Sequence, residues 1–362
     1  MIPFYKPPVG EEEAQAVFDV VKSGWLTYGS KTEQFEQEFA KYINAPYCVM
    51  TNSCTWALFL AVAWWKQQQF GNEMIGDIYY PISIPSLTCA ATALAVIHNR
   101  LPVKFDDLRY RPIDSFVMRT TDSPSIPVHF AGKHCRQLNV VVEDCAHRIV
   151  RNGFSGNLQA YSFYVTKNLT TGEGGMIACA TKEQAEWFKQ ARLYGIDKNV
   201  REREKMFSEG KRSWYFQCLF PGWKCNPTDI NATIGLVQLQ KLDIMNESRR
   251  QVAQKYNQLI GCTMDREAWH LYPILIKKRD DFIEYMKSKD IHCSVHFPPL
   301  HQMPAFKSGD KLPITDWVFQ HIVSLPFYPY MEDGDIETVA KEVNGWHNKY
   351  GQPTLYKEQY EN

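Results

Sequence analysis

The sequence predicts an α/β fold, with a large domain built on a mostly parallel sheet between helices and a smaller C-terminal α+β domain. Apolar segments of strand length alternate with helical patterns along the first part of the chain, and this alternation is typical of a parallel sheet covered on both faces. The chain has 362 residues, of which 44% are hydrophobic, which is enough for two cores. We expect the large domain at residues 1–240 and the small domain at residues 241–362.

Composition narrows the possible functions. The net charge is zero and the Lys and Arg residues are scattered, so we expect no nucleic-acid partner. The N-terminus lacks a signal-peptide pattern and no apolar run reaches transmembrane length, so we expect a cytoplasmic protein without a membrane partner. The 10 cysteines form no C-x-x-C pair and are expected to be reduced thiols. The group His292, Cys293, His296 and His301 fits no zinc spacing, so no metal site is expected.

The large domain begins with two predicted helices, from Glu11 to about Lys22 and from about Thr32 to Ile43. A strand at residues 47–52 follows, and then Ser53-Cys54-Thr55 opens an apolar helix. Free backbone N–H groups at such a helix start favour an anion. Ordinary N-capping by Ser53 or Thr55 is the alternative, and both interpretations can hold together.

A second candidate feature is an acidic residue at the end of an apolar strand. The strand predicted at residues 140–143 ends at Glu143-Asp144, and His147 lies three residues beyond Asp144. A carboxylate emerging from a buried strand needs a positive partner or water. The alternative is that Asp144 only caps the following helix.

A third feature is a lysine at the tip of a predicted hairpin. The strand at residues 161–165 is followed by Lys167, then by Gly172, Gly174 and Gly175, and the strand at residues 176–180 follows. A solvated loop lysine is the alternative. The combination of an amine, a buried carboxylate and an anion-binding helix start is what pyridoxal 5'-phosphate (PLP) requires.

The remainder of the chain yields further predicted elements. A polar segment at residues 197–212 is expected to be a surface loop or short helix that is mobile or covers something. Two successive helices are predicted at residues 228–242 and 244–260. Strands at residues 270–276 and 292–297 then alternate with helices at residues 279–289 and 336–350.

Eight stretches in order resemble the nucleotide-sugar aminotransferases of the DegT/DnrJ/StrS type, which are fold-type I PLP enzymes. The resemblance covers nearly the whole chain. Its motifs are S-G-W-L-T-Y-G (23–29), N-S-C-T (52–55), P-S-L-T-C-A-A-T-A (85–93), V-E-D-C-A-H (142–147), S-F-Y-V-T-K-N-L-T-T-G-E-G-G-M (162–176), K-C-N-P-T-D-I-N-A-T-I-G-L-V-Q-L (224–239), S-V-H-F-P-P-L-H (294–301) and S-L-P-F-Y-P (324–329). The lysine motif is the most specific.

The resemblance implies three catalytic residues. Lys167 would hold the cofactor as a Schiff base and carry the proton between the substrate carbon and the cofactor. Asp144 would pair with the pyridinium nitrogen, which keeps the ring an electron sink. His147 matches a position where the family has Gln or His near the phenolic oxygen.

The resemblance also implies a phosphate site that two chains complete. Ser162 and the backbone amides of Cys54 and Thr55 would bind the phosphate from one chain. Asn226 matches an Asn that crosses from the partner subunit. We therefore expect an obligate homodimer with shared active sites.

The implied reaction is a ping-pong transfer that converts PLP to its pyridoxamine form (PMP) and back. L-glutamate would be the amine donor, and the acceptor would be a nucleotide-linked 3- or 4-keto-6-deoxyhexose, which yields an amino sugar for glycan biosynthesis. Candidate substrate-binding residues are Thr27, Arg212, Trp214, Tyr215, Lys224 and His296. Of these, Arg212 and Lys224 are the candidates for the carboxylate of the donor.

Four departures from the family pattern affect particular positions. Cys89 stands where many relatives have an aromatic residue stacked on the ring. Cys54 replaces a Gly, and Pro227 replaces a larger residue. The stretch from 106 to 140 is shortened by about one helix, so that edge of the domain is expected to be trimmed.

Three other functions share this fold. A sugar 3-dehydratase has His in place of the lysine, and Lys167 argues against it. A PLP-binding regulator without catalysis and a PLP enzyme acting on a non-sugar substrate remain as alternatives.

Overall fold

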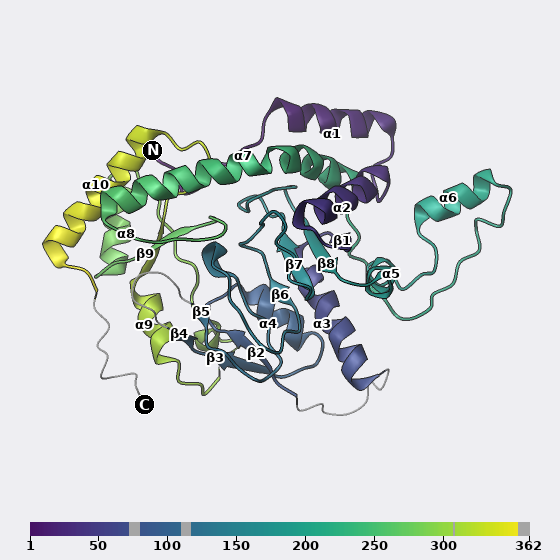
Figure 1. Cartoon of the computed structure of the whole chain (residues 1–362), viewed down its shortest axis with the longest axis horizontal. Helices are drawn as coiled ribbons and strands as arrows, with labels where there is room; N and C mark the ends of the chain where they lie inside the picture. The colour runs from purple at the N-terminus through teal and green to yellow at the C-terminus, as the bar shows by residue number, and fades with distance from the viewer. Residues whose placement is uncertain (72–79, 110–116, 307, 354–362) are drawn as a thin grey trace.

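The computed structural model describes residues 1–71, 80–109, 117–306 and 308–353. Figure 1 shows helices on both sides of a central sheet, with the long helix α7 crossing one side of the molecule. The central sheet has the strand order β1-β8-β7-β6. These strands are formed by Tyr47–Thr51, Gly175–Cys179, Gln159–Ser162 and Glu143–Asp144.

The predicted parallel character of the sheet is confirmed. Single parallel bridges from Asp144 to Val128, from Val140 to Ser125 and from Ser125 to Ser83 extend the sheet beyond β6. They lead to β2 (Ile82–Pro85), which pairs in parallel with β3 (Val103–Asp106). Within the described residues of this sheet, only β8 runs antiparallel to its neighbours, β1 and β7.

The strands bury both faces because alternate side chains point to opposite sides. Val49 of β1 and Ile177 of β8 join one core together with α3 (Cys54–Phe70), α4 (Ala90–Ile97) and α5 (Lys182–Ala191). Their neighbours Met50 and Met176 join the opposite core, with α2 (Ser30–Ile43) and the first half of α7 (Asp229–Ile260). The result is a helix–sheet–helix sandwich.

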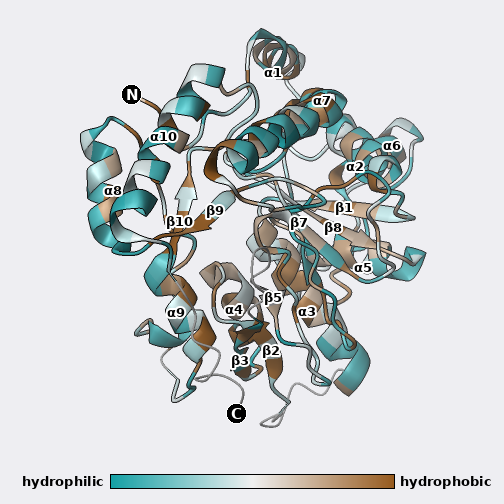
Figure 2. Cartoon of the chain, turned by 60° about the vertical axis from the view of Figure 1, so that its left-hand side comes forward, coloured by the Kyte–Doolittle hydropathy of each residue, from teal (hydrophilic) through white to brown (hydrophobic). Residues whose placement is uncertain are grey.

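The smaller C-terminal unit is α+β, as predicted. Its antiparallel strands β9 (Tyr272–Leu275) and β10 (Ile322–Leu325) pack with α8 (Arg279–Ser288), α10 (Asp333–Tyr350) and the second half of α7 around a separate core. Helix α9 (Pro313–His321) lies beside this sheet. In Figure 2 the strands are mainly brown, whereas the outer faces of α8 and α10 are largely teal.

Two predictions about elements are wrong. The two helices expected at residues 228–242 and 244–260 form the single helix α7, so the expected domain division after residue 240 falls inside a helix that contributes to both cores. The strand expected at residues 292–297 is reduced to one bridge between Ser294 and Ser324, because Pro298 and Pro299 follow and cannot donate to a ladder.

The remaining elements complete the described chain. They are α1 (Glu11–Ser23), α6 (Val200–Ser208), the paired strands β4 (Leu108–Arg109) and β5 (Val117–Met118), and the 3-10 turns η1 (Phe130–Gly132) and η2 (Leu300–Gln302). Helix α6 has no buried residue and projects from the body of the molecule, which agrees with the surface element predicted there (Figure 1). Across the described ranges, no helix is long and apolar enough to cross a membrane.

Candidate active site

A cavity of about 390 Å³ lies where β1, β6 and β7 end and β8 begins. Ligands in open α/β sheets bind at this carboxyl edge. Residues from the small domain, including His270, His296 and Phe297, line the other side, and Phe4 and Tyr5 contribute from the N-terminal segment. The cavity therefore needs both domains and the start of the chain, which only the folded molecule brings together.

The first helical turn of α3 faces the cavity. Ser53, Cys54 and Thr55 all line the cavity. Ser53 is also the N-cap of α3, because its Oγ accepts a hydrogen bond from the Trp56 amide at 3.4 Å. The capping interpretation is therefore confirmed, and it is compatible with the predicted anion site, because the cap leaves the amides of residues 54 and 55 without an intrahelical acceptor.

Gly175 allows β8 to run directly against this helix start. A Cβ atom at residue 175 would lie 2.4 Å from the Ser53 carbonyl carbon and 2.5 Å from the Cys54 nitrogen. Both contacts are with backbone, so no side-chain rotation could relieve them. The close approach also brings Ser162 of β7, which pairs with Gly175, to the same end of the cavity.

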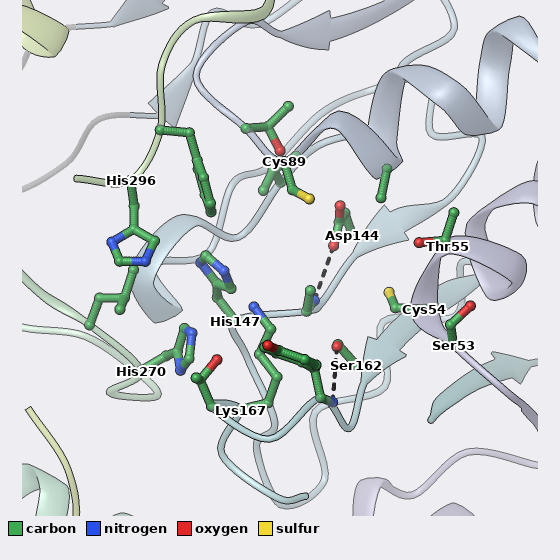
Figure 3. Close-up of a pocket in the computed structure, with 18 of the residues that line it drawn as sticks. Ser53, Cys54, Thr55, Cys89, Asp144, His147, Ser162, Lys167, His270 and His296 are labelled. Atoms are coloured by element: carbon green, nitrogen blue, oxygen red, sulfur yellow. Dashed lines mark hydrogen bonds between the residues drawn. The ribbon is translucent and has the colours of Figure 1, made fainter. Parts of the chain in front are cut away.

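Asp144 is buried and held in one orientation. Thr92 Oγ1 donates a hydrogen bond to Oδ2 at 2.9 Å, and the Ala146 amide donates to Oδ1 at 3.1 Å (Figure 3). The Ala146 bond shows that Asp144 caps a short turn, whereas the helix that the alternative interpretation expected after Asp144 is not present, and Asp144 also lines the cavity. Burial raises the pKa of Asp144, and these two donors and Lys167 oppose the increase. A cationic partner inside the cavity would stabilise the carboxylate.

Lys167 points into the cavity from the loop between β7 and β8, so it is not a solvated loop lysine (Figure 3). Burial lowers the pKa of Lys167, and the Asp144 carboxylate partly opposes this effect. A larger share of the amine is therefore neutral and nucleophilic at neutral pH than in a solvated lysine.

Three histidines surround the lysine. Their pKa values are lowered, first by burial and also by the charge of Lys167, and that of His296 falls to about 4. The rings of His147 and His270 lie 4.4 Å apart between centroids, and the Ala131 amide donates to His147 Nδ1 at 3.2 Å. His147 and His296 were predicted from sequence, whereas His270 was not. A histidine next to an apolar strand gives no signal of its own, because only the packing of the small domain brings it to Lys167.

The residues present fit PLP. The helix start and Ser162 supply donors for a phosphate, Asp144 supplies a carboxylate for the ring nitrogen, and Lys167 supplies the amine. Cys89, which replaces the expected aromatic residue, is exposed and lines the same cavity. Its side chain thus lies at the position where the resemblance implies a stacked aromatic ring.

Other predicted residues lie outside the cavity of their own chain. Asn226 is half-buried and interacts with Lys224 and the Pro227 carbonyl. Trp214 and Tyr215 are 71% and 50% exposed, on the projecting segment that also carries α6. The full set absent from the lining is Thr27, Arg212, Trp214, Tyr215, Lys224 and Asn226.

The one group with metal-ligand geometry among the described residues is His129, Glu143 and Cys145. The Cys135 amide donates to His129 Nδ1 at 3.0 Å, so Nε2 carries the proton and donates to Glu143 at 3.0 Å. Asn157 and Gln159 also donate to the same carboxylate. His129 therefore has no free lone pair, and this cluster is an internal hydrogen-bond network.

A three-layer α/β fold with a buried lysine, a buried carboxylate and a helix start at one sheet edge is typical of the fold-type I class. A family model described as the DegT/DnrJ/EryC1/StrS aminotransferase family matches residues 7–344. The chain belongs to this family, and the prediction that it is an aminotransferase is confirmed.

Known proteins match over nearly their full length. An uncharacterized protein of Methanocaldococcus jannaschii is 36% identical over 94% of this chain and 96% of its own. The spore coat polysaccharide biosynthesis protein SpsC of Bacillus subtilis is 34% identical over the same shares. Among solved structures, a putative sugar aminotransferase of Streptococcus pneumoniae in its PMP form has a TM-score of 0.83 at 24% identity, covering 96% of this chain and 100% of that chain. The Helicobacter pylori aminotransferase PseC has a TM-score of 0.81 at 18% identity, with the same coverage. These likenesses confirm the fold.

Proposed function

We propose that this protein is a PLP-dependent aminotransferase that moves the amino group of L-glutamate to a nucleotide-linked keto-deoxyhexose. The convergence of Lys167, Asp144 and the α3 helix start on one cavity is the observation that carries the proposal. Family membership supports the transferase reaction, and the PLP and PMP forms of a solved relative agree with the cofactor. The names of relatives active in polysaccharide and pseudaminic acid biosynthesis support a sugar acceptor.

When bound, PLP supplies an electron sink for the carbanion formed at the substrate carbon. The chain supplies the groups around it. Lys167 Nζ would take the proton from the donor carbon and deliver it to the cofactor, since its lowered pKa leaves part of the amine neutral. Asp144, oriented by Thr92 and the Ala146 amide, would keep the ring nitrogen of the cofactor protonated. The amides of residues 54 and 55, with Ser162, would hold the phosphate.

The active form is proposed to be a homodimer in the cytoplasm. No Arg lines the cavity within the described residues, and its one lysine is Lys167, so a cation for the donor carboxylate has to come from elsewhere. Arg212, Lys224 and Asn226 lie outside the cavity of their own chain, as residues that serve a partner would. The exposed aromatic residues of the projecting segment, among them Phe207 and Trp214, also suit a surface that a second copy covers.

The acceptor can be tested by binding and by turnover. Because a ligand bound only by the folded state stabilises it, UDP, GDP and TDP should be compared in thermal unfolding of the PMP form. The nucleotide that raises Tm is then tested as its keto-sugar conjugate, with the amino sugar detected by mass spectrometry and Lys167→Ala as the inactive control. Protection by none of the three, together with turnover of a free keto acid, would favour a non-sugar substrate.

A further inference from the structure

A buried arginine outside the cavity lies against the backbone of the lysine loop. Arg249 of α7 is 2% exposed and is among the largest fully buried side chains. Its Nη2 donates to the Asn168 carbonyl at 3.1 Å, and its Nη1 donates to Asn246 Oδ1 at 3.0 Å. Within the described chain, no carboxylate pairs with it. A buried unpaired guanidinium is costly, so stability alone is a poor reason for its presence.

The preceding carbonyl of the loop, that of Lys167, is also bound by a side chain. Tyr5 Oη donates to the carbonyl of Lys167 at 3.3 Å. Burial raises the pKa of Tyr5, and the Arg249 guanidinium opposes this increase, so the two side chains face each other. The adjacent carbonyls of Lys167 and Asn168 are thus both bound by the side-chain pair of Tyr5 and Arg249.

Helix α7 donates hydrogen bonds to the lysine loop at two places, at residue 168 and at residue 171. Near its start, Asn231 Nδ2 donates to the Thr171 carbonyl at 2.9 Å. Asn168 Nδ2 in turn donates to the Trp269 carbonyl at 2.8 Å, which ties the loop to the segment before His270. In Figure 1, α7 runs from the side of α1 and α2 to the side of α8 and α10.

Arg249 stands where α7 passes from one core to the other. Met245, one turn earlier, belongs to the core of the large domain, and Val252, one turn later, belongs to the core of the small domain. The side chain between them points to the lysine loop. A change in the packing of either domain would therefore reach Lys167 through this contact.

We propose that Arg249, together with Tyr5, is a positioning residue that sets the orientation of Lys167 by clamping the carbonyls of residues 167 and 168. This inference rests on the proposed function only in that Lys167 holds the cofactor. The clamp acts on the backbone, so the amine stays free to move through its own flexible stem. Loss of these two hydrogen bonds should therefore change the orientation of the Lys167 side chain more than it changes the stability of the fold.

The test uses the full chain loaded with PLP and compares Arg249→Met with the wild type. Visible circular dichroism per bound cofactor reports the orientation of the lysine-linked cofactor, and we expect it to fall by at least about half. Because small misplacements at a reacting centre cost up to about 100-fold in rate, bleaching by L-glutamate should slow about 10- to 100-fold. Loss of PLP on dialysis should also be faster.

Arg250→Met is the matched control. Arg250 is the next residue of α7, lies on the surface and pairs with Glu247. It should retain wild-type dichroism and bleaching rate. Arg249→Lys keeps one donor and the charge, so it should restore part of both signals.

Tyr5→Phe provides a second test in case the Arg249 variant does not fold, because it removes only one hydroxyl group. It should lower the dichroism in the same direction, and its effect should be smaller when Arg249→Met is already present, since both act on one loop. Unchanged dichroism in Tyr5→Phe and in a folded Arg249→Met or Arg249→Lys variant would overturn the proposal. A wild type that takes up no PLP would instead refute the proposed function.

Discussion

Asp144 illustrates how a single residue acquires its role from its neighbours. Its carboxylate is buried, yet a hydroxyl and an amide keep both oxygens bonded. Thr88 Oγ1 lies 3.1 Å from Thr92 Oγ1, which orients the Thr92 proton toward the carboxylate. The two hydroxyls and the amide therefore restrict the rotation of the carboxylate.

Thr92→Val should weaken this function without removing the carboxylate. A hydrogen bond to a charged group contributes about 1.5–3 kcal/mol, so we expect roughly 10- to 100-fold slower bleaching by glutamate. Stopped-flow absorbance measures this rate. Thr88→Val removes only the outer hydroxyl, so it should have a clearly smaller effect on the bleaching rate. Equal effects of the two variants would contradict the proposal that Thr92 is the direct donor to Asp144.

Active-site residues can be predicted from sequence when the chemistry requires a rare combination of residue types at the ends of strands. Lys167, Asp144 and the start of α3 were predicted because each stands at the end of an apolar strand, where the fold directs it to one edge. His270 and Arg249 could not be predicted in the same way. Their roles depend on the small domain and α7 packing onto the loop, and no local pattern encodes that contact.

At the scale of elements, the decisive contact is that of β8 with the start of α3. Gly175→Ala places a methyl group on the backbone of Ser53 and Cys54, so the helix start must move. We expect PLP affinity to fall at least about 10-fold, as measured by fluorescence titration. Gly345→Ala in α10 is the control, because nothing lies within 4 Å of the added carbon and alanine favours a helix.

The single helix α7 shows where element prediction failed. The division expected near residue 243 has no Pro or Gly to end a helix. Asp243, which lies between the two predicted helices, remains helical and accepts hydrogen bonds from Tyr42 and Arg151 on neighbouring elements. Tertiary partners, which the sequence does not reveal, explain a charged residue there.

At the scale of the whole molecule, an active site shared between two chains predicts complementation between two inactive variants. If Lys167 and Asn226 of one site come from different chains, mixing Lys167→Ala with Asn226→Asp should give mixed dimers with one intact site. Each variant alone should be nearly inactive, and the mixture should recover up to about one quarter of the activity by random pairing. Differently tagged chains purified in tandem provide the measurement. No recovery in confirmed mixed dimers would place both residues in one chain.

The buried histidines predict an acid limit to the stability of the cofactor-free protein. His147, His270 and His296 are neutral in the folded state, with lowered pKa values, that of His296 being about 4. Below the ordinary pKa of about 6.5 the unfolded chain binds more protons, so stability falls as pH decreases from about 6.5 to 4. His296→Gln should reduce this loss in the free energy of unfolding, by up to about 3 kcal/mol at pH 4. The exposed His98→Asn variant should keep the wild-type dependence in denaturant titrations.

The most direct test of the central claim is the absorption spectrum of the purified protein before and after addition of L-glutamate. We predict a yellow band that shifts to the near-ultraviolet band of the pyridoxamine form with glutamate, and that is absent in Lys167→Ala. That result would establish the cofactor, the lysine and the first half of the reaction together. A protein that stays colourless after incubation with PLP, or a band that glutamate leaves unchanged, would contradict the account.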